Sequence, residues 1–94
     1  MNEVYILTIL KEVTDMRPEV QTAVYRDMSS ALMGYNVSVD EARAEAEDYE
    51  FPHEESEICT DSYRYFRIED LHSNDAITIE VQTKEVIGEE PDDL

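Results

Sequence analysis

Apolar residues in this sequence recur in short alternating blocks, and this pattern constrains the fold more than any other feature. The clearest block runs from Ala76 to Lys84, where every second residue from Ile77 to Val81 is aliphatic. Side chains of a β-strand point alternately to its two faces, so this block predicts a strand with one buried face. Tyr63 to Glu69 alternates in the same way, and residues 70–75 supply turn chemistry between the two predicted strands.

Two more strands are predicted near the N-terminus. The segment Glu3 to Val13 contains a continuous apolar or β-branched run from Val4 to Leu10, which is typical of a central strand covered on part of each face. A turn that ends at Pro18 follows, and Glu19 to Arg26 alternates again. Together the two segments predict a β-hairpin.

The spacing of apolar residues becomes helical after Asp27. Four residues at positions i, i+3, i+4 and i+7 predict a brief helical turn over residues 28–33, for which Gly34 would serve as the cap. These residues are Met28, Ala31, Leu32 and Tyr35.

A second and longer helix is predicted directly after this turn. Ser38 followed by Glu41 matches a capping box, in which the serine hydroxyl accepts a hydrogen bond from the Glu41 amide. The pattern predicts a main helix from Val39 to about Glu50, ended by Pro52. Its apolar stripe would pack on the sheet. The stripe consists of Val39, Ala42, Ala46 and Tyr49.

These elements predict an α+β fold, with an antiparallel β-sheet of about four strands in ββαββ order and one main helix packed on one face. The residues between Phe51 and Ser62 are expected to form a polar, acidic loop. The length allows a single domain, which we assign to residues 1–87, and residues 88–94 are expected to form a flexible acidic tail. Because carboxylates repel one another, we expect either marginal stability at low salt or a homodimer that enlarges the core.

The charge balance of the chain bears on its partners. The sequence has 24 Asp and Glu residues against 7 Lys and Arg, a net charge of −17. The density is highest between Asp40 and Glu57, where nine acids face Arg43 alone. Carboxylates at i and i+4 of a helix rise about 6 Å, and those at i and i+2 of a strand rise about 6.6 Å. Both spacings approximate neighbouring phosphates along one nucleic-acid strand.

We therefore expect a track of carboxylates that resembles nucleic-acid phosphates and binds Lys and Arg side chains of a partner. The residues of this track are Glu41, Glu45, Asp48, Glu54, Glu55 and Glu57. The expected partner is a basic protein surface, such as the groove of a nucleic-acid-binding protein or nuclease. The expected role is that of an inhibitor or nucleic-acid mimic, of the kind that phages and mobile elements use against host defence.

Other interpretations of the acidic residues stay open. A solvated helix face is the commoner origin of an acidic helix, and adaptation to high salt also produces many acids with few lysines. The alternative function is a small structural or regulatory module that assembles through its sheet, in which Tyr63 and Tyr65 would contribute more than the acids. Binding of a divalent ion by the acidic loop is a third, weaker option.

Signals for catalysis and for cofactors are weak. His53, Cys59 and His72 are the only soft ligands or nucleophile candidates, and their spacing matches no zinc pattern. We expect no catalytic residue, no metal site and no cofactor, and hence a protein that is not an enzyme. Residues 63–67 interleave aromatic side chains with arginines, but the net negative charge would repel a nucleic acid, so we expect them to pack within the sheet.

The sequence also bears on the compartment. A single cysteine, Cys59, excludes an intramolecular disulfide and is typical of a reducing compartment such as the cytoplasm, or the host cytoplasm for a phage protein. The apolar run from Val4 to Leu10 is too short for an export signal or a membrane span. We therefore expect a cytoplasmic protein with no membrane partner.

Overall fold

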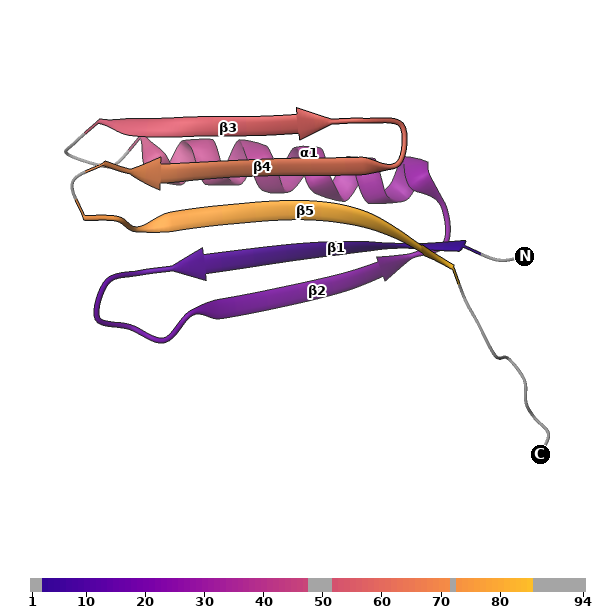
Figure 1. The fold of residues 1–94 in the computed structure, drawn as a ribbon, viewed down its shortest axis with the longest axis horizontal. Helices are drawn as coiled ribbons and strands as arrows, with labels where there is room; N and C mark the ends of the chain where they lie inside the picture. Colours follow the sequence, from indigo (N-terminus) through magenta and orange to yellow (C-terminus); the bar gives the residue numbers. More distant parts are fainter. Residues whose placement is uncertain (1–2, 48–51, 72, 86–94) are drawn as a thin grey trace.

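A computed structural model of the chain describes residues 3–47, 52–71 and 73–85. Over these residues the chain forms an α+β fold in ββαβββ order, with a five-stranded antiparallel sheet and one helix on one face (Figure 1). The elements are β1 (Glu3–Glu12), β2 (Glu19–Tyr25), α1 (Met28–Ala46), β3 (His53–Cys59), β4 (Tyr63–Asp70) and β5 (Ala76–Glu85). The strand order across the sheet is β2-β1-β5-β4-β3.

The first and last strands of the described residues, β1 and β5, pair with each other in the middle of the sheet. β1 pairs with β5 over ten residues, from Glu3 opposite Glu85 to Glu12 opposite Ala76. The predicted hairpin of β1 and β2 is confirmed, with Tyr5 opposite Tyr25. β4 and β5 also form where their alternating patterns predict strands. The central strands are therefore those with the clearest apolar patterns in the sequence.

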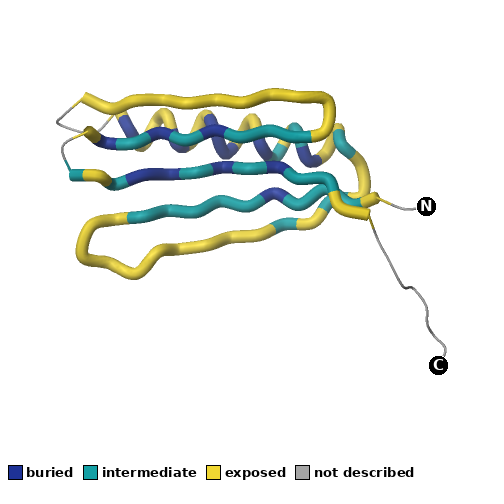
Figure 2. Tube along the Cα trace, viewed as in Figure 1, coloured by how far each residue is buried: buried dark blue, intermediate teal, exposed yellow. Residues whose placement is uncertain are grey.

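The core lies between α1 and the covered face of the sheet. From the helix it takes Ala31, Tyr35, Val39, Ala42 and Ala46, and from the strands Leu7, Phe66, Ile68, Ile77, Ile79 and Val81. Residues directly opposite each other on paired strands project from the same face of the sheet. Ile79 is opposite both Ile9 and Phe66, so all three side chains lie on the face that the helix covers. The small alanines let the helix approach the sheet closely. Figure 2 shows that burial is concentrated on α1, β4, β5 and β1, whereas the two edge strands are mostly exposed.

The division of the helical region into a brief turn and a separate helix is wrong. α1 is continuous over 19 residues, and its N-cap is Asp27, whose carboxylate accepts a hydrogen bond from the Ser30 amide at 2.8 Å. Ser38 is buried inside the helix and does not cap it. The reason is tertiary packing, because the buried residues of α1 recur at helical spacing on both sides of Ser38 and face one continuous core. Asp48, Tyr49 and Glu50 lie outside the described residues.

The prediction of an acidic loop between Phe51 and Ser62 is also wrong. This segment contains β3, which is the strand additional to the four that were predicted. All seven residues of β3 are exposed. The strand therefore lacks the alternation of apolar and polar residues by which a half-buried strand is recognised in a sequence. It forms because its backbone pairs with β4, from His53 opposite Asp70 to Cys59 opposite Arg64. The predicted tail at 88–94 and the domain limit at residue 87 lie outside the described residues.

Candidate functional site

The six carboxylates expected to bind a partner lie on two elements. Glu41 and Glu45 belong to α1, and Glu54, Glu55 and Glu57 belong to β3. Asp48 lies outside the described residues. On β3, Glu55 is opposite Ile68 and Glu57 opposite Phe66, both of which face the helix. Glu54 is opposite Glu69 and therefore projects from the other, open face of the sheet.

Arg43 connects α1 to β3 and compensates one of these carboxylates. Its Nε and Nη2 atoms donate to the Glu55 carboxylate, with Nε to Oε2 at 3.2 Å and Nη2 to Oε1 at 3.0 Å. The guanidinium carbon also lies 5.1 Å from the centre of the Phe66 ring. The hydrogen bonds from Arg43 to Glu55 raise the pKa of this arginine, and the negative charges of Glu57 and Asp40 raise it further. One cation therefore stands among three carboxylates on this flank of the helix.

Glu41 and Glu45, the two carboxylates of the predicted track that belong to α1, lie on the opposite flank of the helix, above β1 and β2. Lys11 Nζ of β1 donates to Glu45 Oε1 at 3.3 Å. Glu41 lies close by, on the same hollow as Ile9 and Gln21. The structure thus brings Glu55 and Glu57 together on one flank and Glu41 and Glu45 together on the other, and it places Glu54 on the open face. The described members do not form one continuous track.

The ion pairs distinguish the five described carboxylates. Glu45 and Glu55 are each paired with a cation, at 3.3 and 3.0 Å. Within residues 3–47, 52–71 and 73–85, no Lys or Arg forms an ion pair with Glu41, Glu54 or Glu57. Glu54 and Glu57 are exposed on the same edge strand. The β3 edge is therefore where uncompensated carboxylates and free backbone groups coincide.

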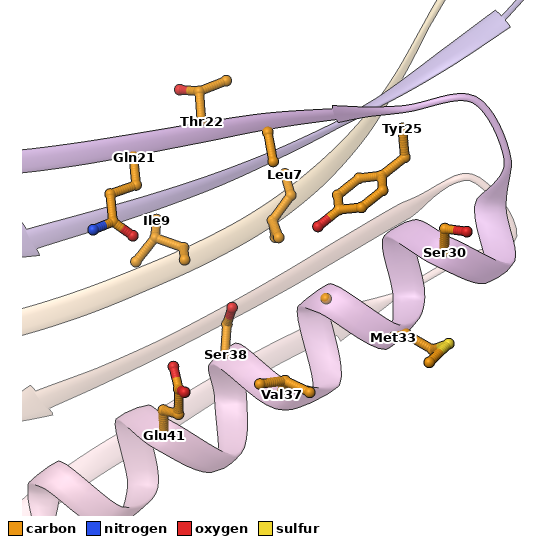
Figure 3. Close-up of a pocket in the computed structure, with 12 residues that line it drawn as sticks. Leu7, Ile9, Gln21, Thr22, Tyr25, Ser30, Met33, Val37, Ser38 and Glu41 are labelled. Atoms are coloured by element: carbon orange, nitrogen blue, oxygen red, sulfur yellow. The ribbon is translucent and has the colours of Figure 1, made fainter.

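A groove of about 620 Å³ lies between α1 and the hairpin of β1 and β2, and it was not predicted from the sequence (Figure 3). Leu7, Ile9 and Ala23 line its sheet side, whereas Gly34 and Val37 line its helix side. It exists because α1 packs more closely on β5 and β1 than on β2, which contributes only Ala23 and Tyr25 to the packing around the core. The only hint in the sequence is Gly34, a glycine within a helical pattern, which indicates a close approach of another group.

The open face of the sheet carries three aromatic or basic residues of β4, which are Tyr63, Tyr65 and Arg67. Tyr63 Oη donates to Glu80 Oε2, and this hydrogen bond, followed by burial, raises the pKa of Tyr63 to about 12. Arg67 Nη1 donates to Thr78 Oγ1 at 2.8 Å and to Glu12 Oε1 at 3.3 Å. Phe66, on the other face, is fully buried in the core. The hydrogen-bonding groups of Tyr63 and Arg67 are thus engaged within the sheet.

Within the described residues, the His and Cys side chains do not form a metal centre. Cys59 is exposed, and its thiol donates to Glu57 Oε2 at 3.7 Å. His72 lies outside the described residues. In the described part of the chain, no three His, Cys, Asp or Glu side chains are arranged so that they could hold a metal ion. No helix of that part combines the length and the apolar character needed to cross a membrane.

Comparison of the chain with protein-family models, with curated proteins and with solved structures finds no match. The function is therefore inferred from the residues of this chain alone. Two surfaces carry that inference. One is the β3 edge, with its uncompensated carboxylates, and the other is the exposed apolar side of the β1–β2 hairpin.

Proposed function

We propose that this chain is a non-enzymatic acidic binding protein that docks on the basic groove of a nucleic-acid-binding protein or nuclease, and so acts as an inhibitor or nucleic-acid mimic. The observation that carries the proposal is the β3 edge. Among the described residues, no Lys or Arg forms an ion pair with Glu54 or Glu57 of this edge, and all seven residues of the strand are exposed. Asp61, in the turn after β3, adds a fourth exposed carboxylate to those of Glu54, Glu55 and Glu57.

The geometry of an edge strand favours this role over that of a merely solvated surface. Successive side chains of β3 project to opposite faces, so a basic groove that encloses the edge would contact Glu54 on one wall and Glu57 on the other. Pairing with β4 holds these side chains on a rigid element, which lowers the entropy lost on binding. The total charge of −17 is also comparable with the roughly 18 phosphates on about 30 Å of duplex DNA.

The proposal is tested by competition. A panel of nucleases and other basic nucleic-acid-binding proteins is loaded with a fluorescent duplex, and the chain is titrated in at low salt while anisotropy is followed. We expect displacement of the duplex from at least one member of the panel, and we expect the effect to weaken steeply as salt is added. Failure to displace the duplex from every member would contradict the proposal.

Two double variants with the same change in charge locate the contact. Glu54→Gln with Glu57→Gln removes the uncompensated carboxylates of β3, and about a tenfold loss of inhibition is expected. Glu3→Gln with Glu85→Gln is the matched control, because these exposed residues face each other at the far end of β1 and β5. Equal losses from both double variants would mean that overall charge binds the partner, and not the β3 edge.

A second candidate function is a structural or regulatory module that assembles through its sheet. It is favoured by the open face, where Val20, Val24 and Ile58 are between 51% and 62% exposed. Under this function the acids maintain solubility only, and truncation of Tyr63 or Tyr65 to alanine would weaken assembly more than any change to Glu54 or Glu57. Association would then persist or strengthen at high salt, opposite to electrostatic docking.

A further inference from the structure

The two edges of the sheet differ in how well they are protected against pairing with another strand. β3 carries three glutamates in seven residues, and charges on an edge discourage further pairing. β2, with the sequence EVQTAVY, carries only Glu19 as a charged residue, and its seven positions contain neither lysine nor proline. Five of these seven residues are exposed, and only Ala23 and Tyr25 pack against the core. An edge of this kind is a template for another strand.

We propose that β2 pairs with β2 of a second copy of this chain, which produces a symmetric dimer with one continuous ten-stranded antiparallel sheet. The inference is independent of the proposed function, because it uses the edge opposite β3. The helices of both copies would lie on the same face of the combined sheet, since a two-fold axis perpendicular to the sheet keeps each face on its own side.

The sequence of β2 is complementary to itself when the two strands are centred on Thr22. This register pairs all seven residues and places Val20 of each copy opposite Val24 of the other. Both valines lie on the open face, because they pair with Leu10 and Ile6 of β1. They are 60% and 62% exposed in the single chain. The dimer would therefore cover two valine pairs and extend the apolar strip that Ile6 and Leu10 begin.

Charge also favours a second copy as the occupant. The segment from Arg17 to Asp27 contains two arginines and two acids and is neutral, in a chain with a net charge of −17. The centred register brings Arg17 of one copy towards Asp27 of the other, and Glu19 of one next to Arg26 of the other. A basic partner would gain little here, whereas a second copy meets opposite charges at both ends of the strand.

The proposed assembly stops at two chains. Once both β2 strands are paired, the remaining edges are two β3 strands, each protected by its glutamates. A single-strand interface is at the small end of specific interfaces, below about 1,200 Å², so the dimer is expected to be weak. Repulsion between two strongly negative chains is screened by salt, so dimerisation should strengthen as salt is added. Docking on a basic partner has the opposite salt dependence.

Sedimentation of the full chain over the micromolar to millimolar range at high salt measures the association. We expect a species of twice the 10.9 kDa chain mass. The double variant Val20→Lys with Val24→Lys places like charges opposite each other and should raise the dissociation constant about tenfold or more. The same variant reduces the net charge from −17 to −15. The weaker overall repulsion would by itself lower the dissociation constant, so it cannot account for an increase. Circular dichroism checks that the fold is retained.

A register-specific variant provides the matched control. Val20→Lys with Val24→Glu places opposite charges across both symmetric pairs, so dimerisation should return, whereas any register shifted from Thr22 would not pair them. For cross-linking, Thr22→Cys is made in a Cys59→Ser background, because Cys59 is exposed. Opposite Cα atoms in an antiparallel pair are about 4.5–5.5 Å apart, which a disulfide spans. Thr8→Cys, on the inner neighbour β1, should not cross-link in the same background.

Three results would overturn the dimer. These are a monomer at the highest concentration and salt, a dimer that survives Val20→Lys with Val24→Lys, and equal cross-linking of the Thr22→Cys and Thr8→Cys variants. None of them would alter the outcome of the displacement assay, which depends on Glu54 and Glu57 at the other edge.

Discussion

The hydroxyl oxygen of Tyr25 lies 2.7 Å from the position that a β-carbon on Gly34 would occupy. This close approach explains a glycine in the interior of a 19-residue helix, where it costs about 1 kcal/mol relative to alanine. Tyr25 extends from β2 towards α1 over one end of the groove (Figure 3). The contact therefore joins the edge strand β2 to the helix.

This contact predicts a coupling between the two positions. Gly34→Ala alone should be neutral or destabilising, because the gain in helix propensity is offset by displacement of the tyrosine hydroxyl. In a Tyr25→Phe background the nearest hydroxyl is gone, but Leu7 Cδ2 at 3.1 Å and the ring carbon at 3.3 Å stay close, so Gly34→Ala should be less destabilising there than in the parent chain. Urea unfolding of the four proteins measures the cycle. Equal effects of Gly34→Ala in both backgrounds would show that Tyr25 does not restrict this site.

The contacts of Arg43 predict the effect of a conservative substitution. Arg43→Lys keeps the charge but loses the two-nitrogen contact with Glu55 and the stacking on Phe66. The side chains of Arg43 and Glu55 are 46% and 35% exposed, so the pair contributes at the lower end of the usual range. We expect a loss of about 0.5–1 kcal/mol in thermal or urea unfolding. Arg17→Lys, on an exposed turn, is the control and should change nothing.

Tyr35 predicts a stabilising substitution in the core. Tyr35 is 3% exposed, and its hydroxyl has no partner at hydrogen-bond distance among the described residues, although the Glu57 carboxylate is near enough to raise its pKa. A buried hydroxyl without a partner lowers stability, so Tyr35→Phe should raise the free energy of unfolding by about 1 kcal/mol. Tyr63→Phe is the contrasting control, since it removes a hydroxyl that donates to Glu80 and should destabilise. A loss of stability in Tyr35→Phe would contradict this account of the core.

The same two tyrosines predict how stability changes at alkaline pH. Burial, followed by the negative charge of Glu57, raises the pKa of Tyr35 from 10.0 to about 12. The hydrogen bond to Glu80 is the main cause of the similar pKa, about 12, of Tyr63. A pKa that is higher in the folded state stabilises the fold fully below pH 10, and this contribution is lost as the pH rises towards 12.

Urea unfolding at a series of alkaline pH values measures this loss. Tyr63→Phe should weaken the decrease in unfolding free energy between pH 10 and 12. Only one tyrosine with a raised pKa, Tyr35, then remains. Ultraviolet titration of the folded protein should show the corresponding phenol ionising late. Ordinary ionisation of all tyrosines near pH 10 would count against both shifts.

The fold could be predicted from the sequence wherever burial leaves a pattern. β1, β4 and β5 face the core, so their apolar residues recur at the spacing of a strand. β3 could not be found in this way, since all of its residues are exposed and only its backbone is engaged by β4. The helix was divided wrongly because Ser38 resembles a cap in the local sequence but occupies a buried position in the middle of α1.

The candidate site shows the same limit. The sequence indicated that carboxylates are concentrated between Asp40 and Glu57, but not which of them are compensated. Lys11 reaches Glu45 across 34 positions, and Arg43 reaches Glu55 across 12. These pairs depend on which strand lies beneath each flank of α1. Local spacing on one element therefore could not distinguish Glu54 and Glu57 from their paired neighbours.

By itself, the sequence determined the charge of this protein, the α+β class and the strands that contain its apolar residues, because each depends on composition or on local periodicity. Only the tertiary structure decided that the two ends of the described chain, β1 and β5, pair at the centre of the sheet. It also decided that its edges are the acidic strand β3 and the strand β2, whose one charged residue is Glu19. The physical reason is that edges and ion pairs arise from contacts between residues far apart in the chain, which no local pattern encodes.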